Sequence, residues 1–174
     1  MTDDAAMASG LHQRFEDADD FTAALRAAEV DYLPLAAGRY QARLTVMRVG
    51  PFTIQHAHDA AHISRGGMAA DRGGLIMAAS APHAIAMNGE DVTPATASLQ
   101  MPGSDLHALC RQRLAWMAVS APAAEVEALL DHWAMAGPRR GASAMLAFAP
   151  DRIARLRGTL VAMTALVGEA PWWE

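Results

Sequence analysis

The chain has 174 residues, a formal net charge of −5 and a hydrophobic share of 52%. This length suits a single domain with a well-filled core, and the acidic balance disfavours a broad basic surface for nucleic acid. The single cysteine, Cys110, excludes an intrachain disulfide, and the acidic start of the chain lacks the basic and then apolar pattern of a secretory signal. No apolar run approaches the roughly eighteen residues of a membrane span. The sequence therefore predicts a cytoplasmic protein without a membrane partner.

The N-terminal part is polar before any packing signal begins. Residues 1–18 are acidic and without period, and we interpret them as a tail. Apolar residues then recur at helical spacing from Phe21 to Ala28, and Asp19 or Asp20 can cap that segment. A short helix is therefore expected at the start of the first folded segment, residues 19–120.

Short strands punctuated by glycine and proline follow as far as Ser120. Asn88-Gly89 tolerates positive φ at both positions and predicts a type I′ hairpin, while Gly66-Gly67 and Gly73-Gly74 are interpreted as turns. The expected strands are 32–35, 40–49, 52–58, 62–68, 75–80, 83–87, 90–93, 98–101, 106–110 and 114–120. This even spacing is typical of a sandwich or a barrel, and we expect an antiparallel β-barrel over residues 19–120.

After Ser120 the period becomes helical, so residues 121–174 are expected to be a helical segment. A first helix should begin near Pro122 and a second should run from Pro150 to Val167, with a short apolar piece, 144–148, before it. The second helix has apolar residues in steps of three and four, namely Ile153, Leu156, Leu160, Met163 and Val167. Such a seam can pack on the barrel or against the same helix of a second copy, and a homodimer through it is expected.

Histidines mark the most informative strand. In an extended segment Phe52, Ile54, His56 and His58 share one face, opposite to Thr53, Gln55, Ala57 and Asp59. If the first face is the barrel interior, a neutral imidazole there needs a hydrogen-bond partner, a ligand or a metal. His62 and His107 are the histidines best placed to join them.

Several segments together resemble one protein family. These are Phe21-Thr-Ala-Ala-Leu, Tyr32-Leu-Pro-Leu, Ala42-Arg-Leu-Thr, Met87-Asn-Gly-Glu, Met101-Pro-Gly-Ser-Asp-Leu-His and Leu114-Ala-Trp-Met-Ala-Val-Ser. Over residues 15–170 the order resembles the N-terminal half of AraC-type bacterial transcriptional regulators. The resemblance implies a mainly β, cupin-like jelly-roll barrel followed by two α-helices, which binds an effector and dimerises. It also implies that DNA is contacted by a helix-turn-helix half that these residues do not include.

On this interpretation a small-molecule effector enters the barrel. The expected ligand-binding residues are Phe52, Ile54, His56, His58 and His107, and no cofactor is expected. One alternative is a metal-dependent cupin enzyme, an oxygenase or isomerase, with His56, His58 and His107 as ligands. Against that enzyme, Asp59 and His62 stand where metal-binding cupins carry a glutamate. A further alternative, a stand-alone dimerisation module that inactivates a full-length regulator, shares the fold and differs only in its partners.

Overall fold

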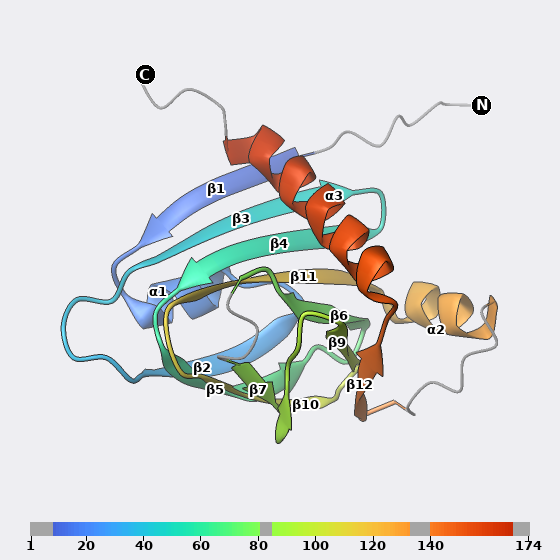
Figure 1. Ribbon diagram of the computed structural model, residues 1–174, viewed down its shortest axis with the longest axis horizontal. Coiled ribbons are helices and arrows are strands. Elements are labelled where there is room, and N and C mark those ends of the chain that lie inside the picture. Colours follow the sequence, from blue (N-terminus) through green and yellow to red (C-terminus); the bar gives the residue numbers. More distant parts are fainter. Residues whose placement is uncertain (1–8, 81–84, 133–139, 169–174) are drawn as a thin grey trace.

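The computed structural model describes residues 9–80, 85–132 and 140–168. Within these residues the chain is mainly β, with twelve strands and three helices (Figure 1). The elements in chain order are β1 Ser9–Phe15, α1 Ala18–Ala24, β2 Ala28–Pro34, β3 Ala42–Val49, β4 Phe52–Asp59, β5 His62–Met68, β6 Arg72–Ala78, β7 Ile85–Met87, β8 Glu90–Asp91, β9 Thr96–Gln100, β10 Asp105–Cys110, β11 Leu114–Pro122, α2 Ala123–His132, β12 Ser143–Ala147 and α3 Pro150–Gly168.

The strands form two antiparallel sheets instead of the expected closed barrel. The seven-stranded sheet has the order β1-β3-β4-β11-β6-β9-β12, and the five-stranded sheet has the order β2-β5-β10-β7-β8. Each sheet keeps its own edges, and no closed barrel is found in the described part of the chain. Alternating apolar residues specify one buried face per strand, which a sandwich and a barrel require equally. The mainly β prediction is confirmed, whereas closure of the barrel is wrong.

The expected N-terminal tail contains a strand. β1 pairs along its whole length with β3, from Ser9 opposite Arg48 to Phe15 opposite Ala42. Phe15 is buried in a cluster with Phe21. Residues 1–8 lie outside the described residues, so the tail of 1–18 is wrong for its second half. β1 is an edge strand that is mostly exposed, and its polar composition therefore concealed it.

The first helix is shorter than its periodicity predicts. Its cap is Asp17, whose side chain accepts hydrogen bonds from the backbone amides of Asp19 (2.8 Å) and Asp20 (3.1 Å). The helix ends at Ala24, and the chain turns at Ala27, which has a φ of 68°. Strand β2 therefore begins at Ala28, the residue that the sequence pattern predicted to be the last of the helix.

The glycine pairs behave differently from one another. Asn88 and Gly89 have φ values of 49° and 87°, and they join β7 to β8 as the expected hairpin. The residues 83 and 84, expected to start this hairpin, lie outside the described residues. The pairs Gly66-Gly67 and Gly73-Gly74 lie inside β5 and β6 instead of between strands. A side chain at Gly66 would collide with the carbonyl oxygen of Glu29, so close strand approach is the reason for glycine there.

Helix α3 covers the outer face of the seven-stranded sheet (Figure 1). Ile153 and Leu160 are buried there beside Ile54, and Met163 and Val167 pack against the same cluster. The predicted dimer seam of Ile153, Leu156, Leu160, Met163 and Val167 therefore packs mainly on its own sheet, and only Leu156 stays 36% exposed. This placement corrects the expectation that the seam faces a second copy.

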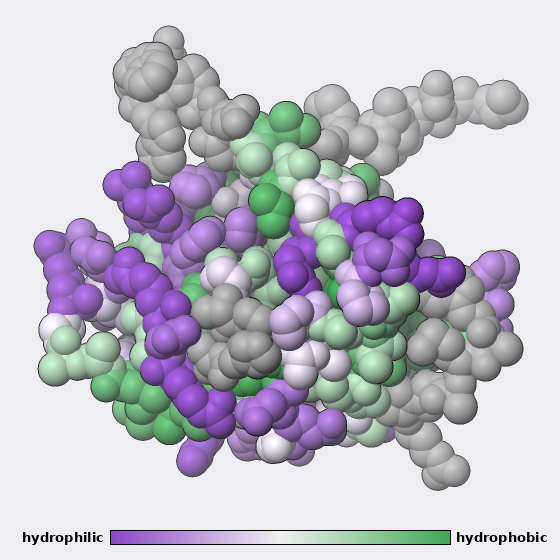
Figure 2. Space-filling model, viewed as in Figure 1, coloured by the Kyte–Doolittle hydropathy of each residue, from purple (hydrophilic) through white to green (hydrophobic). Residues whose placement is uncertain are grey.

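The two C-terminal helices are separated by a strand. Helix α2 packs at one end of the seven-stranded sheet through Val126, and β12 then adds to the edge of that sheet beside β9. None of the helices in the described residues is long and apolar enough to span a membrane. On the face seen in Figure 2, hydrophilic residues predominate and the apolar patches are small. The apolar clusters of the core lie between the sheets and under α3.

Candidate functional site

The four candidate residues of β4 lie on the outside of the sandwich. Their face is the one that helix α3 covers: Ile54 packs with Leu160, and the His56 Nδ1 lies 3.2 Å from the Thr164 hydroxyl. Phe52 packs toward the cluster under α2, and His58 is exposed at the far end of the strand. The alternation along β4 is as predicted, but the face assigned to the interior is the opposite one.

His107 lies on the other sheet. Its strand, β10, places it on the outer face opposite Arg65, and the side chain is exposed. The histidines 56, 58 and 107 therefore do not converge. In the described parts of the chain, no group of three His, Cys, Asp or Glu side chains could hold a metal ion. The ligand set of the alternative enzyme is thus not formed by these residues.

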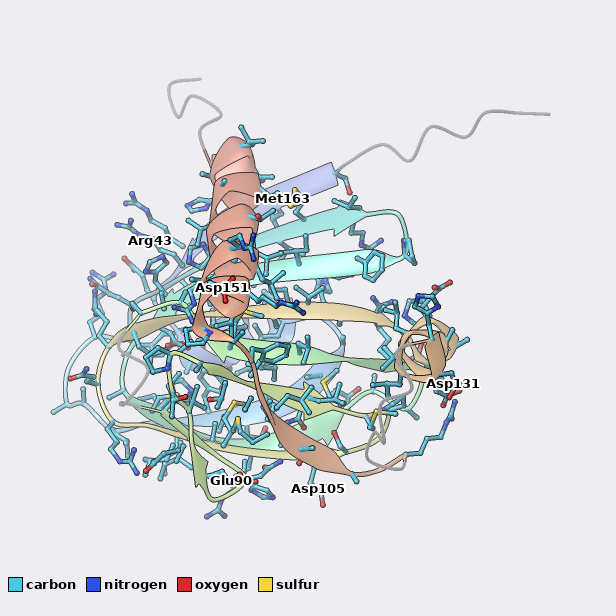
Figure 3. The ribbon with its side chains drawn as sticks, turned by 45° about the vertical axis from the view of Figure 1, so that its right-hand side comes forward. Arg43, Glu90, Asp105, Asp131, Asp151 and Met163 are labelled. Atoms are coloured by element: carbon cyan, nitrogen blue, oxygen red, sulfur yellow. The ribbon has the colours of Figure 1, made fainter. Side chains whose placement is uncertain are left out.

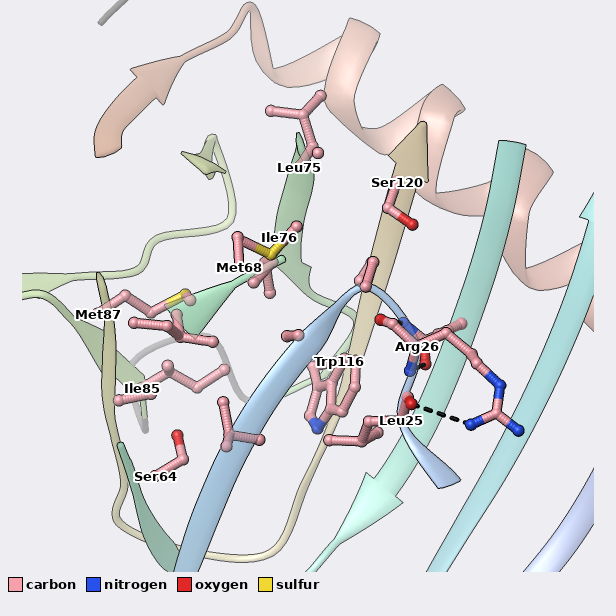
Figure 4. Close-up of a pocket in the computed structure, with 18 of the residues that line it drawn as sticks. Leu25, Arg26, Ser64, Met68, Leu75, Ile76, Ile85, Met87, Trp116 and Ser120 are labelled. Atoms are coloured by element: carbon pink, nitrogen blue, oxygen red, sulfur yellow. Dashed lines mark hydrogen bonds between the residues drawn. The ribbon is translucent and has the colours of Figure 1, made fainter. Parts of the chain in front are cut away.

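A cavity of about 80 Å³ lies between the two sheets. Its walls come from the inner faces of both sheets and from the connection between α1 and β2 (Figure 4). The lining residues are Leu25, Arg26, Ala27, Ala28, Val30, Tyr32, Gln55, His62, Ser64, Met68, Gly74, Leu75, Ile76, Ile85, Met87, Leu106, Ala108, Cys110, Trp116, Ala118, Val119 and Ser120. None of the predicted ligand-binding residues is among them, so this cavity replaces the predicted pocket as the candidate site.

Most of the wall is apolar. Met68, Met87, Ile76 and Ile85 gather on one side of the cavity, and the Trp116 ring lies across from them on β11 (Figure 4). Methionine side chains are flexible and adapt to irregular shapes. This side of the wall can therefore adjust to a ligand more easily than the aromatic side.

Gln55 closes the cavity at the α1–β2 connection. Its side-chain carbonyl accepts a hydrogen bond from the Arg26 amide (2.9 Å), and its side-chain NH₂ donates to the Arg26 carbonyl oxygen (2.9 Å). The Arg26 guanidinium points away from the cavity and donates to the carbonyl oxygens of Ala23 and Leu25 (Figure 4). Gln55 thus holds the backbone of Arg26 in place, while the charged guanidinium of Arg26 stays outside the cavity.

Polar side chains gather at one end of the cavity. Tyr32 stacks on His62 with ring centroids 3.9 Å apart, and the His62 Nδ1 lies 2.9 Å from the Ala60 carbonyl oxygen. The Trp116 indole donates to the Asp59 carboxyl at 3.0 Å. Asp59 is 1% exposed, and its second oxygen has no hydrogen-bond partner in the described residues. Tyr32, His62 and Trp116 thus form the polar end of the wall, while Asp59 is bonded to Trp116 and is not itself a lining residue.

Burial disfavours the charged forms of these groups. It raises the pKa of Asp59 to about 7, while the neighbouring Trp116 and Tyr32 favour the ionised carboxylate. Burial also lowers the pKa of His62, which the carbonyl of Ala60 partly offsets. The Cys110 thiol has its pKa raised to about 12 by burial and by Asp59, so it is not a reactive thiolate.

Ser120 adds a polar group in a different part of the wall. Its hydroxyl oxygen is buried and has no hydrogen-bond partner within the described residues. Ser64, also buried, lines the cavity from the five-stranded sheet. A buried hydroxyl without a partner costs free energy, which a ligand that offers a donor or acceptor would recover.

The strand pattern held a signal for this site. Thr53, Gln55 and Asp59 occupy the second face of β4, and polar residues buried on a strand need partners. The outer face, however, carries the larger apolar residues of the strand, Phe52 and Ile54, because helices cover that face as well. The packing of α3 decides which face of β4 is interior, and the sequence of β4 by itself does not reveal that packing.

The comparisons with known proteins show the fold alone. Neither a protein-family model nor a curated protein matches the sequence. Among solved structures, the chain is similar to the crystal structure of the AraC-like transcriptional activator CuxR, with a TM-score of 0.62 and 14% sequence identity. The match covers 94% of this chain and 63% of that chain, so the chain spans somewhat less than two thirds of the length of the activator. This antiparallel β fold with a C-terminal helix is therefore that of a domain found in an AraC-like regulator.

Proposed function

We propose that this chain is the effector-binding and dimerisation domain of a cytoplasmic AraC-type transcriptional regulator. The observation that carries the proposal is the mostly apolar cavity between the sheets, with a few buried polar groups in its wall. Small-molecule sites have this composition. The fold shared with an AraC-like activator supports the same role. DNA contact is assigned to a helix-turn-helix part separate from these residues, and we expect the chain alone to lack sequence-specific DNA affinity.

The cavity size limits the effector. At about 80 Å³ it is smaller than an apolar cavity of about 150 Å³ that admits benzene. The effector is therefore compact and mainly apolar, and the methionine side of the wall yields on binding. A donor group on the effector would pair with the Ser120 hydroxyl oxygen, which lines the cavity and has no partner in the described residues.

The two faces of β4 and β11 offer a route from the cavity to α3. Gln55 and Trp116 face the cavity, while His56 and Met117, the next residues along each strand, lie under α3. A ligand that shifts either strand would therefore move the surface on which α3 packs. Such a shift requires different ligand affinities for two packings of the helix.

Methionine methyl NMR tests the binding site. The probes are cyclic hydrocarbons and alcohols of about five to seven carbon atoms, which fit only if the methionine side of the wall yields. We expect the methyl signals of Met68 and Met87, which line the cavity, to shift at saturation. Met47 and Met117, which lie under α3, report whether the change is transmitted to the helix.

A matched pair of variants makes the test specific. Ala108→Leu places three extra carbons in the cavity, whereas Ala86→Leu places them on the outer face of the same sheet. Binding should be lost in the first variant and retained in the second. Equal binding by both variants, or no shift of Met68 and Met87 with any probe, would refute the sensor assignment.

Dimerisation is proposed through the exposed side of α3. From Gly158 to Gly168 the helix has no charged residue, while Val161 and Leu166 are 39% and 76% exposed. A helix surface that is apolar and uncharged over this length is suited to a protein contact. The proposed dimer contact therefore uses Val161 and Leu166 in place of the predicted seam, because the seam packs on the seven-stranded sheet.

A further inference from the structure

Basic side chains form a row across the seven-stranded sheet, on the face away from the cavity. Arg14 on β1 lies directly opposite Arg43 on β3, and Arg43 lies directly opposite His58 on β4. Like charges that face each other across strands destabilise a sheet unless something compensates them. The row therefore concentrates basic side chains on one face of a chain whose net charge is −5.

A fourth basic residue reaches the same place from another element. Arg113, just before β11, lines with these three a surface hollow of about 350 Å³, which we name the arginine hollow. The remaining lining residues are Phe15, Glu16, Gln41 and Ala42. Its volume falls within the range of about 300–1,000 Å³ that is usual for small-molecule sites.

Two of the arginines in this hollow, Arg43 and Arg113, have no carboxylate partner among the described residues. Glu16 is the acidic side chain in its lining, and Glu16 pairs with Arg39. Within residues 9–80, 85–132 and 140–168, Arg43 and Arg113 form no ion pair with a carboxylate. Figure 3 shows Arg43 projecting from the sheet beside α3 toward solvent. Two guanidinium groups that line one concave surface are thus without a carboxylate partner in the described part of the chain.

We propose that the arginine hollow is a second ligand site, separate from the cavity, which binds a compact polyanion through Arg14, Arg43, Arg113 and His58. The ligand carries at least two anionic groups, phosphate or carboxylate. Guanidinium forks bind both groups through paired hydrogen bonds. The arginines come from two strands and a turn, and His58 comes from a third strand, so the width of the hollow favours a ligand with two anionic groups.

The location gives the site a connection to α3. His58 and His56 have ring centroids 4.7 Å apart, and His56 contacts Thr164 of the helix. Anion binding would draw β1, β3 and β4 together directly beside this contact. The site can therefore influence the packing of α3 independently of the interior cavity.

Calorimetric titration of the full chain tests the site, with pyrophosphate, citrate and inorganic phosphate as probes. We expect pyrophosphate, citrate or both to bind more tightly than inorganic phosphate, and binding to weaken as ionic strength rises. Binding of pyrophosphate alone identifies a phosphate ligand, and binding of citrate alone identifies a carboxylate ligand. Arg43→Gln and Arg113→Gln should each weaken the binding by about tenfold or more, since each removes a charge-assisted hydrogen bond.

Arg48→Gln is the matched control, because Arg48 lies on β3 with Arg43 but does not line the hollow. Its affinity should remain within about twofold of the unmodified chain. Equal weakening by Arg48→Gln and Arg43→Gln would indicate attraction to overall charge and would overturn the proposal. The same holds if no small anion binds or if binding is seen only with a DNA oligonucleotide.

The imidazole of His58 provides a second readout. Burial, Arg43 and His12 all lower its pKa. A bound polyanion should raise the pKa of His58, measured by NMR titration with and without pyrophosphate or citrate. An unchanged pKa in the presence of a saturating anion would place that anion elsewhere and contradict the assignment.

Discussion

Asp59 is a carboxylic acid enclosed by the sandwich, with one oxygen hydrogen-bonded to Trp116 and the other without a partner in the described residues. Burial raises its pKa from 3.8 to about 7. Between these two pH values the folded state binds more protons at this residue than the unfolded state does. The stability that the neutral acid contributes is therefore complete below about pH 3.8 and is lost as the pH rises through about 7.

Asp59→Asn should remove this dependence. We expect the free energy of unfolding of the variant to fall less than that of the unmodified chain as the pH rises from 4 to 8, with a difference in slope of at most about 1.4 kcal/mol per pH unit. Urea denaturation across this pH range measures it. Identical pH profiles for the two proteins would show that folding does not raise the pKa of Asp59.

His56 has the opposite effect on how the stability of the fold depends on pH. Burial, with smaller effects from His58 and His12, lowers its pKa from 6.5 to about 4. The unfolded state then binds more protons at this residue, so the contribution of neutral His56 is present above pH 6.5 and is lost as the pH falls toward 4. The Thr164 hydroxyl donates to the Leu160 carbonyl oxygen, so it is suited to accept a hydrogen bond from His56 Nδ1.

His56→Gln should therefore reduce the loss of stability between pH 6.5 and about 4, while it retains a donor toward Thr164. The same urea series reports this change. Since Asp59 and His56 act with opposite signs in overlapping pH ranges, the two single variants should change the slope in opposite directions. Changes of the same sign would contradict one of the two assignments.

At the scale of elements, replacing glycine by alanine should have opposite effects on stability at Gly74 in β6 and at Gly158 in α3, because their surroundings differ. A Cβ at Gly74 would collide with the carbonyl oxygen of Val119, whereas one at Gly158 on α3 would meet no atom within 4 Å. Gly74→Ala should lower the free energy of unfolding by about 1–3 kcal/mol through overpacking. Gly158→Ala should raise it by about 0.5–1 kcal/mol, since alanine favours the helix. Chemical denaturation of both variants decides this, and equal stabilities would show that β6 does not approach β11 so closely.

The packing of α3 on its own sheet can be measured through two leucines of the predicted seam. Leu160 is 5% exposed and lies in the cluster with Met117, whereas Leu156 is 36% exposed. Leu160→Ala should lower the free energy of unfolding by about 2–5 kcal/mol, because it leaves a cavity in the core. Leu156→Ala should cost less than about 1 kcal/mol at the surface. A reversed order would place Leu156 inward and return the seam to a contact between two copies.

Most of the strands along the chain could be predicted from the sequence, because alternating apolar residues and turn residues are features of short sequence segments. β5 runs from His62 to Met68 as expected, and the Asn88-Gly89 hairpin has the expected positive φ values. Gly66 and Gly74 were interpreted as turn residues because the local sequence cannot distinguish a turn from a close approach between strands. Their environment depends on Glu29 and Val119, which are distant in the sequence.

At the scale of the whole molecule, the candidate site could not be predicted from the sequence. Its position depends on which face of the seven-stranded sheet packs against α3 and which face packs against the second sheet. The parity of β4 was evident, yet only the packing of α3 assigns Ile54 and His56 to the outside and Gln55 to the cavity. The arginine hollow likewise depends on the register that aligns Arg14, Arg43 and His58 across three strands. Sheet register and helix docking are global properties, and a sequence pattern constrains them only weakly.

The second half of α3 provides the last prediction, which concerns assembly. Leu166 is 76% exposed on an uncharged stretch of the helix, so replacing it should not disturb the core. If two copies pair through this surface, Leu166→Arg brings two charges into an apolar contact, where unpaired charges are costly. We expect the chain to show twice the mass of one copy by light scattering, and the variant to show the mass of one. Leu33→Arg, at a position 62% exposed on the five-stranded sheet, is the control and should remain dimeric. A monomeric unmodified chain, or dissociation by Leu33→Arg instead, would move the interface away from α3.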